Sequence, residues 1–228
     1  MATAKKTELV EIRPMELVTV PIHIEGTSPL IMHAWDSKAK QMMLDKQMKK
    51  ATSTKEAKNP VSDFINSMYW LTPMPTEMTE DAFAAAIEGG ARFGFPVTAF
   101  KQATISGAYR RGYVKDKMSL RGAFFINSDA NTIYNRDGAA SMDMVEIKSD
   151  APIIREDMVK IALGTADIRY RGEFRNWSAD LQITYDKNGP FSIQQLVNFV
   201  NVGGWTCGVG EWRPERDGQY GMYKVATT

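Results

Sequence analysis

Near the start of the chain, apolar and polar residues alternate from Val18 to Ile24. A period of two predicts a strand with one buried face. Pro21 has no N–H to donate to a neighbouring strand, so we expect this strand to lie at a sheet edge, carry a bulge or begin late. The preceding residues, 1–15, are mostly polar and predict a mobile arm.

The pattern then becomes helical. Asp36 or Ser37 can cap a helix, and its expected buried residues are Ala39, Met42 and Met43. Residues 49–59 contain lysines but no large apolar side chain, which predicts a mobile basic loop with few contacts. Two short helices are predicted at Pro60–Trp70 and Glu80–Glu88. We interpret residues 36–90 together as a helical insertion.

A further helix is predicted from Thr98, which can act as its N-cap. Its small-residue face is expected to pack closely on a sheet, and this face comprises Phe100, Ala103, Thr104, Gly107 and Ala108. Arg110 and Arg111 come at its end, where the helix dipole favours cations without any ligand. Strands are predicted at Leu120–Ile126 and Met144–Ile147, on either side of a polar loop at 127–143.

Two alternating runs, 167–174 and 177–185, meet at Arg175 and Asn176. If these two residues form the loop of a hairpin, Phe174 faces Trp177 and all apolar positions lie on one side. The other side then carries Arg169 and a cross-strand pair between Arg171 and Asp180. A longer loop with a shifted register is the alternative.

The last helix has a clear beginning. Ser192 and Gln195 form a capping box, and an apolar stripe follows with i, i+3, i+4, i+7 spacing at Ile193, Leu196, Val197 and Val200. We expect Gly203 and Gly204 to end the helix. A glycine-rich segment then leads to a final strand at 222–225.

That glycine-rich segment, residues 203–221, carries the most chemical information. Its glycines allow backbone to approach a ligand closely, arginines pair with phosphate, and aromatic rings stack on bases. The interleaved residues are Trp205, Trp212, Arg213, Arg216 and Tyr220. The segment is no P-loop, because it follows a helix and lacks the GxxxxGK[ST] motif. The alternative is a structured turn whose tryptophans fold onto the core.

Charge is balanced overall but grouped along the chain. Lysine and arginine number 28 against 27 aspartates and glutamates, a net charge of +1. Basic residues predominate at 36–60 and again at 101–121, whereas acidic residues predominate at 129–157. Two interpretations stay open, namely solvated faces or a groove that follows a phosphate backbone.

The same composition argues against catalysis. A single cysteine, Cys207, can form neither an internal disulfide nor a CxxC zinc site, and His23 and His33 are the only histidines. No GxSxG or HExxH motif occurs, and adjacent acids such as Glu156 and Asp157 are expected to be solvated charges. We therefore expect no enzymatic activity, no cofactor and no metal. No apolar run approaches the roughly 18 residues of a membrane-spanning helix, so no membrane partner is expected.

Several stretches resemble a family of tailed-phage and prophage proteins that usually carries no assigned function. They are PLIMHAWDSKAKQMMLDKQMKK, GFPVTAFKQA, RGAFF and GVGEWRPERDGQYGMYKV, and the resemblance runs from about Pro29 to Val225. It implies a protein that works in the cytoplasm of an infected host.

The order of a helix at 192–202, a glycine loop at 203–221 and a last strand at 219–225 also resembles the end of RAMP proteins, the RNA-binding backbone subunits of CRISPR effector complexes. This resemblance implies an α+β fold with a ferredoxin-like (RRM/RAMP-like) antiparallel sheet, here in a single domain. It further implies that Gly208, Gly210, Gly218 and Gly221 shape the loop, with Arg213 and Arg216 near phosphate. Pro21 departs from the family, whose first strand is internal.

These observations favour a non-catalytic protein that binds single-stranded nucleic acid and forms homo-oligomers along the strand, in replication, recombination or counter-defence. The alternative is a virion component or a protein that docks on a host complex, because Trp, Tyr and Arg also dominate protein interfaces. The expected nucleic-acid-binding residues are Lys46, Lys49, Lys50, Arg110, Arg111, Lys115, Lys117, Arg121, Arg169, Arg171, Trp205, Trp212, Arg213, Arg216 and Tyr220.

Overall fold

The computed structural model describes residues 14–35, 37–49, 57–127, 133–134, 142–162 and 165–226. It is an α+β protein with antiparallel sheets. The expected arm at 1–15 lies almost entirely outside the described residues, as does most of the expected basic loop at 49–59 and of the polar loop at 127–143. In the described part of the chain, no helix is long and apolar enough to cross a membrane.

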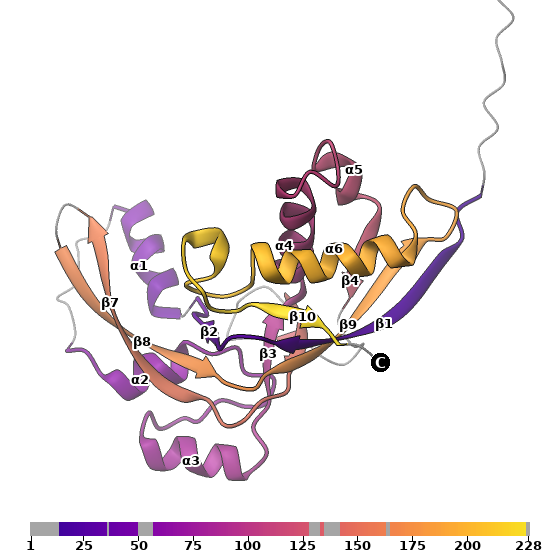
Figure 1. Ribbon diagram of the computed structural model, residues 1–228. Coiled ribbons are helices and arrows are strands. Elements are labelled where there is room, and N and C mark those ends of the chain that lie inside the picture. The colour runs from indigo at the N-terminus through magenta and orange to yellow at the C-terminus, as the bar shows by residue number, and fades with distance from the viewer. Residues whose placement is uncertain are drawn as a thin grey trace, which may run out of the picture.

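The main sheet has the order β10-β1-β9-β4, and every neighbouring pair is antiparallel. Its strands are β1 (Leu17–Gly26), β4 (Phe124–Asn127), β9 (Ser178–Asp186) and β10 (Tyr223–Val225). Two long helices, α4 (Val97–Arg110) and α6 (Ile193–Thr206), cover the same side of this sheet (Figure 1). In the chain, α4 lies between β1 and β4, and α6 lies between β9 and β10.

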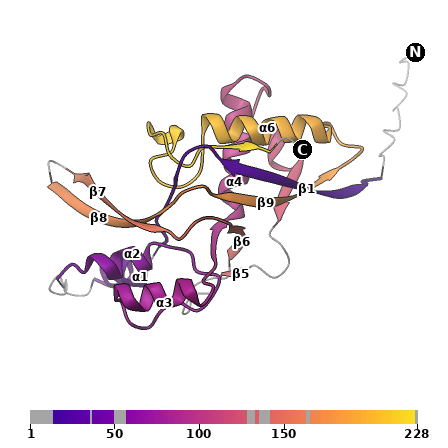
Figure 2. The ribbon, with the colours of Figure 1, turned by 60° about the horizontal axis from the view of Figure 1, so that its bottom comes forward.

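Two smaller sheets flank the main one. In the first, β2 (Leu30–Met32) pairs with β8 (Thr165–Phe174), which pairs with β7 (Ile153–Ala162). The β7–β8 hairpin projects as an arm from the body (Figure 2). In the second, β6 (Met142–Ile147) lies between β3 (Phe93–Pro96) and β5 (Ile133–Tyr134).

The remaining helices are short. They are α1 (Ser37–Gln47), α2 (Pro60–Asn66), α3 (Glu80–Glu88), α5 (Met118–Arg121) and the 3-10 turn η1 (Pro214–Arg216). The prediction of α3 is confirmed residue for residue, whereas α2 is shorter than predicted. α1 does not bury Met43, which is 53% exposed, and the side chains of Ala39 and Met42 lie outside the described residues.

The first strand is confirmed, together with the constraint set by Pro21. β9 pairs with β1 along Leu17–Glu25, but β10 reaches only Ile24–Gly26. At Pro21 the strand is therefore a sheet edge, and the missing N–H costs no ladder hydrogen bond on that side. Apolar side chains of β1 and β9 alternate toward the helices, and Ile22, Ile24, Leu181 and Ile183 are buried.

The predicted hairpin between 167–174 and 177–185 is wrong. β8 pairs with β7, and β9 pairs with β1 and β4, so the two strands belong to different sheets. The chain turns between them at Asn176, which has a left-handed φ of 49°. Trp177 is held by the 26–28 turn, because Gly26 N donates to its carbonyl (2.7 Å) and its Nε1 donates to Ser28 O (2.8 Å). Alternation identified both strands correctly, but it carries no information about their partners.

The predicted ends of the two long helices are also corrected. α4 begins at Val97 after Pro96, with no side-chain cap, so Thr98 lies inside its first turn. α6 has the predicted capping box, but it continues through Gly203 and Gly204 to Thr206. A Cβ on Gly203 would lie 2.7 Å from Thr104 N, and one on Gly204 would overlap Tyr223. These glycines let α6 approach α4 and β10, so α4 packs against a helix as well as the sheet.

The predicted strand at Leu120–Ile126 is only partly correct. Its first residues form α5, and the strand begins at Phe124. The strand predicted at Met144–Ile147 is confirmed as part of β6.

Candidate nucleic-acid interface and an adjoining pocket

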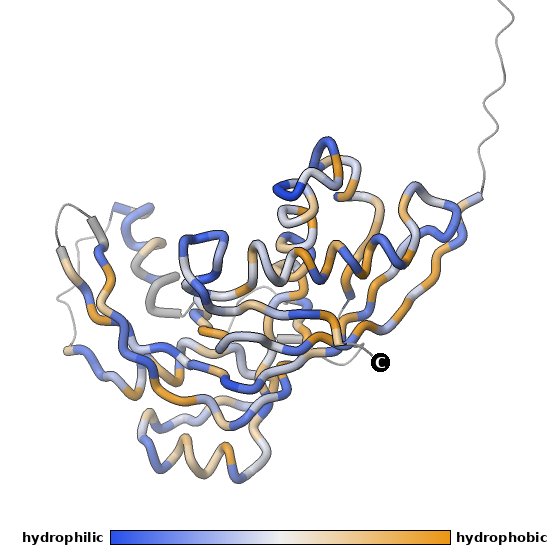
Figure 3. Tube along the Cα trace, viewed as in Figure 1, coloured by the Kyte–Doolittle hydropathy of each residue, from blue (hydrophilic) through white to orange (hydrophobic). Residues whose placement is uncertain are grey.

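The glycine-rich loop runs from Cys207 to Met222, between α6 and β10, and its chain around η1 is hydrophilic (Figure 3). Its backbone is closed on itself, since Val209 N donates to Gly221 O (2.9 Å) and Tyr220 N donates to Trp212 O (3.0 Å). It is also tied to the β2 segment, because Gly221 N donates to Pro29 O (2.8 Å) and Glu211 N to Ile31 O (3.0 Å). These hydrogen bonds therefore fix the backbone of the loop within the fold.

The glycines of this loop serve the protein's own backbone. Gly208, Gly210 and Gly221 have left-handed φ values of 63°, 79° and 63°. A Cβ on Gly218 would overlap Trp212 O, and one on Gly221 would overlap Val209 O. The sequence suggested that the glycine backbone approaches a ligand closely, but in the structure it approaches neighbouring peptide groups of the loop. Only the side chains of the loop are therefore available to contact a ligand.

Two indole rings of this region are exposed. Trp205 is 67% exposed and Trp212 is 39% exposed, so neither folds onto the core. Tyr220 is half-buried and its ring lies 4.5 Å from the Arg155 guanidinium. Arg216 is exposed, and no ion pair within the described residues involves it.

Several hydrogen-bond donors of Arg213 are already used within the protein. Its Nη1 donates to Gly210 O (3.0 Å), and its Nε and Nη2 donate to Glu215 Oε2 (3.3 and 3.2 Å). Glu215 also accepts from Arg110 Nη2 (3.2 Å). This shared carboxylate joins the end of α4 to η1, although the two segments lie about a hundred residues apart in the chain.

Further basic residues lie at the end of α4 and from there to the end of α5. Arg110, Arg111, Lys115 and Arg121 are exposed. Lys117 is half-buried, donates to Ser106 Oγ (3.3 Å) and lies 5.6 Å from the Tyr109 ring. Across the part of the chain that the structure describes, no carboxylate forms an ion pair with Arg111, Lys115 or Arg121. We call Arg110, Arg111, Lys115, Lys117, Arg121 and Arg216 the basic surface.

Trp205 does not face this basic surface directly. Gly203 contacts α4, and Trp205 follows it by two residues, which is about 200° around a helix. Trp205 therefore lies on the side of α6 away from α4. It borders a shallow depression lined by Thr27, Ser28, Pro214, Gly218, Gln219 and Met222.

The two arginines predicted on β8 behave differently. Arg171 is 2% exposed and forms ion pairs with Asp157 (3.2 Å) and Glu211 (3.7 Å). The predicted pair with Asp180 is wrong, because Asp180, on β9 of the main sheet, contacts His23 (2.6 Å) and Lys148 (2.7 Å) instead. Arg171 is thus removed from the candidate site, whereas Arg169 is partly exposed and lies 3.7 Å from Asp167.

Arg171 belongs to a buried charge ladder, which we define as Arg155, Asp157, Arg171 and Glu173. Arg155 donates to Asp157 (3.0 Å) and to Glu173 (2.8 Å). Burial opposes ionisation of Glu173, but hydrogen bonds from Arg175 and Arg155 outweigh it and lower the pKa of this carboxyl. The expectation that Asp157 is a solvated charge is wrong, since it is 9% exposed, whereas its neighbour Glu156 is exposed on the opposite face.

The predicted lysines of α1 lie elsewhere. Lys46 and Lys49 are exposed at the end of this helix, and Lys50 lies outside the described residues. In both Figure 1 and Figure 2, α1 is separated from α4. The structure does not bring these lysines together with the basic surface.

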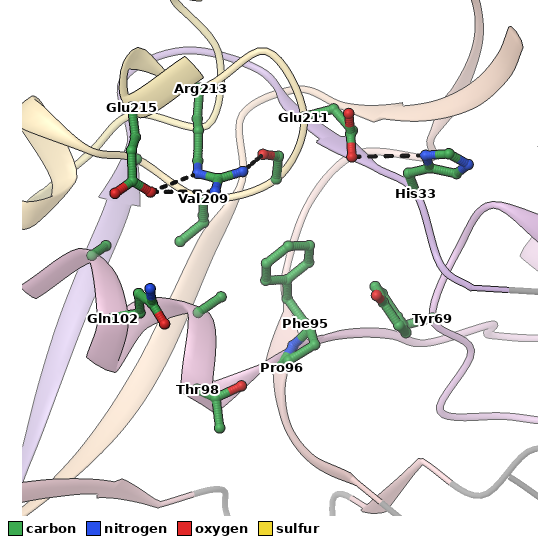
Figure 4. Close-up of a pocket in the computed structure, with 14 residues that line it drawn as sticks. His33, Tyr69, Phe95, Pro96, Thr98, Gln102, Val209, Glu211, Arg213 and Glu215 are labelled. Carbon is green, nitrogen blue, oxygen red and sulfur yellow. Dashed lines mark hydrogen bonds and ion pairs between the residues drawn. The ribbon is translucent and has the colours of Figure 1, made fainter. Parts of the chain in front are cut away.

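A pocket of about 390 Å³ opens between the glycine-rich loop and the beginning of α4 (Figure 4). Its apolar lining comes from Tyr69, Phe95, Pro96, Ala99, Ala103 and Val209. Thr98 and Gln102 project from one side, one turn apart on α4. Glu211, Arg213 and Glu215 come from the loop on the other side, with His33 next to Glu211.

The carboxylates of the pocket contact basic side chains. Glu211 lies 3.7 Å from His33 Nδ1 and 3.7 Å from Arg171 Nη2. His33, assisted by Arg171 and Arg213, holds the pKa of Glu211 below its ordinary value against the opposing effect of burial. Glu215 contacts both Arg213 and Arg110. Both carboxylates of the pocket therefore have basic partners within the protein.

The pocket residues on β3 and α4 were missed as site residues by sequence reasoning. Phe95, Pro96, Thr98 and Gln102 look like parts of a strand and a helix, and nothing local marks them as a lining. The available sequence signal was the alternation of Glu211, Arg213 and Glu215 with a tryptophan and a proline, which puts the three charged residues at every second position.

Comparison with known proteins adds no assignment, because no protein-family model matches the chain and no curated protein matches it in sequence.

Among the described residues, no group of three His, Cys, Asp or Glu side chains could hold a metal ion. Cys207 is buried, and burial raises the pKa of its thiol.

Proposed function

We propose that this protein binds single-stranded nucleic acid without cleaving it. The observation that carries the proposal is the basic surface, in which the end of α4 and η1 are joined through Arg110 and Glu215. Exposed guanidinium and ammonium groups without acidic partners are what a phosphate backbone requires. Among those described, Arg111, Lys115, Arg121 and Arg216 meet this condition.

The exposed indoles support a single strand over a duplex. Trp212 stands on the same loop as Arg216, and Trp205 stands where that loop begins. Aromatic rings stack on unpaired bases with little dependence on sequence, whereas bases in a duplex are already stacked. A nucleic-acid strand that crosses the loop can place its phosphates against the basic side chains and stack its bases on the indole rings.

The main sheet supports the finer fold proposal, a ferredoxin-like arrangement. Each of α4 and α6 connects two strands that have one further strand between them, and the order β10-β1-β9-β4 has the first strand inside the sheet. This order agrees with the double βαβ pattern of that fold and supports the proposal. The 36–90 segment then forms the insertion between its first strand and first helix.

The same proposal includes homo-oligomers that form along the nucleic-acid strand, a phage origin and action in a host cytoplasm. They rest on the sequence resemblance, which includes the loop at 203–221. Under this proposal one copy covers only a few nucleotides, and many copies coat a longer strand.

The test is fluorescence anisotropy with labelled single-stranded oligonucleotides at about 50 mM salt and at increasing salt. We expect binding that weakens steeply, and Arg111→Ala with Arg121→Ala should lower the slope of log affinity against log salt by about 0.7 per lost phosphate contact. Lys187→Ala, which removes an exposed lysine paired with Glu16 (3.3 Å) near the far end of β9, is the matched control. Absence of binding by the unmodified protein would refute the proposal.

One observation favours a second candidate, a docking or structural protein. On the β7–β8 arm, Met158 is opposite Ile168, and these side chains are 72% and 43% exposed. Ile154, on the same face, is 47% exposed. Exposed apolar side chains on a projecting hairpin suit a protein partner. Absence of oligonucleotide binding in the experiment above would leave this candidate as the better one.

A further inference from the structure

We infer that the pocket between the glycine-rich loop and α4 holds one unstacked base that carries an exocyclic amino group, such as cytosine, adenine or guanine. This inference rests on the proposed function, because it names what part of the bound strand the pocket takes. It concerns residues outside the basic surface, so it can fail while that proposal stands.

The shape and lining of the pocket suit a flat ring with polar edges. Its volume of about 390 Å³ is enough for a base and some water. Phe95 and Tyr69 meet edge to face, with ring centroids 5.7 Å apart, and Pro96, Ala99 and Val209 extend this apolar lining. Unpaired bases are commonly placed against such surfaces while their edges form hydrogen bonds.

The polar groups of the pocket determine which base edge fits. Glu211 is ionised, and its contacts with His33 and Arg171 are 3.7 Å long, which is beyond hydrogen-bond distance. Its oxygens can therefore accept from a ligand. An exocyclic amino group donates to a carboxylate. The ring N–H of thymine or uracil is a poorer donor to it, because this N–H lies between two carbonyl oxygens that the carboxylate repels.

Gln102 and Thr98 complete the recognition from the opposite side. A glutamine amide can donate and accept at once, and a threonine hydroxyl can do either. Both side chains belong to exposed positions on α4 that line the pocket. A base with a donor beside an acceptor on its edge can use both walls of the pocket.

The pocket also lies next to the charge needed for the attached phosphates. Glu215 forms its far edge and contacts Arg110, the first residue of the basic surface. Gln102 and Arg110 are separated by two turns of α4, or about 12 Å. A strand held on the basic surface can therefore deliver a base into the pocket within a few nucleotides.

The experiment compares oligo(dC) and oligo(dT) of equal length by anisotropy. The unmodified protein should prefer oligo(dC) by about tenfold. Ala99→Trp fills the pocket and should abolish this preference, with an unchanged salt slope because no phosphate contact is lost. Ala85→Trp, on the exposed face of α3, is the matched control and should retain the preference.

Glu211→Gln provides a second variant if the tryptophan disturbs folding, and it should bring the affinity for oligo(dC) close to that for oligo(dT). The inference is overturned if the unmodified protein binds both oligonucleotides equally, or if Ala99→Trp retains the preference. Those results would leave the proposed function in place. Failure of the unmodified protein to bind either oligonucleotide would instead refute the proposed function itself.

Discussion

Two arginine-rich regions of this protein look alike in the sequence and differ completely in the structure. Arg171, in the buried charge ladder, is 2% exposed and contacts two carboxylates. Arg110, at the start of the basic surface, is 49% exposed and shares one carboxylate with Arg213. Because a ligand needs charge that the protein has left unpaired, Arg171 is not available to a ligand, and loss of one ladder charge is expected to destabilise the fold. The basic surface is available for binding through the side chains that have no acidic partner among the described residues, namely Arg111, Lys115, Arg121 and Arg216.

A second contrast separates two glycines, one where α6 packs against α4 and one in the basic region. Gly203, beside the loop, has Thr104 N within 2.7 Å of where a Cβ would lie. Gly122, which follows α5 in the basic region, has nothing within 4 Å of that position. Close packing around the loop fixes its backbone, whereas the basic region has space around it. Both contrasts predict that substitutions at closely packed or buried positions alter folding, and that substitutions in the basic region alter binding.

Arg171→Leu should have the largest effect, a loss of about 3 kcal/mol in the free energy of unfolding. It leaves Asp157 buried with only Arg155 as a partner, and it removes a contact to Glu211. Urea unfolding followed by tryptophan fluorescence measures this loss. Arg111→Leu, at an exposed arginine, should change stability by less than about 0.5 kcal/mol.

A double variant sharpens this test. Arg171→Leu combined with Asp157→Leu removes both charges, so more than half of the lost stability should return. Equal losses for Arg171→Leu and Arg111→Leu would mean that the two regions do not differ as described.

Gly203→Ala should have the next largest effect, a loss of about 2 kcal/mol. The added methyl meets backbone atoms of Ala103 and Thr104, so α6 must move away from α4. Gly122→Ala is the matched control, because the same methyl enters open space at a φ of −98° that alanine adopts easily. Thermal unfolding of both variants should show a lowered Tm for the first only.

If Gly122→Ala proved as destabilising as Gly203→Ala, close packing would not be what distinguishes these positions. Since alanine favours a helix over glycine by about 1 kcal/mol, a gain in stability for Gly203→Ala would equally contradict the observed approach of α6 to α4.

The same comparison explains which parts of the fold could be read from the sequence. β1, β9 and the start of α6 were predicted because burial of one face and a capping box are written into neighbouring residues. The partner of β9 and the end of α6 were not, because they depend on segments far away in the chain. Gly203 and Gly204 resemble a helix stop until α4 and β10 are placed beside them.

The same limit applies to the candidate site: features set by neighbouring residues could be predicted, and features set by tertiary packing could not. The sequence located the glycine-rich loop and the cations at Arg110–Arg121, but it could not distinguish Arg171, which is buried, from Arg216, which is exposed. It also could not find the pocket, whose lining comes from β3, α4, the β2 segment and the loop together. Side-chain exposure and pocket geometry are products of tertiary packing.

The smallest expected effect is on the pH dependence of stability. The pKa of Glu173 is lower in the folded protein than its ordinary value of 4.5, so the unfolded state binds the proton more readily. Its contribution is therefore complete above about pH 4.5 and is lost as the pH falls through the lower folded pKa. Glu173→Gln removes that ionisation. The difference in free energy of unfolding between the two proteins should be largest near neutral pH and should shrink toward pH 3, as measured by urea unfolding across this range. A difference that stayed constant would mean that the charge on Glu173, and with it the ladder, contributes nothing specific to stability.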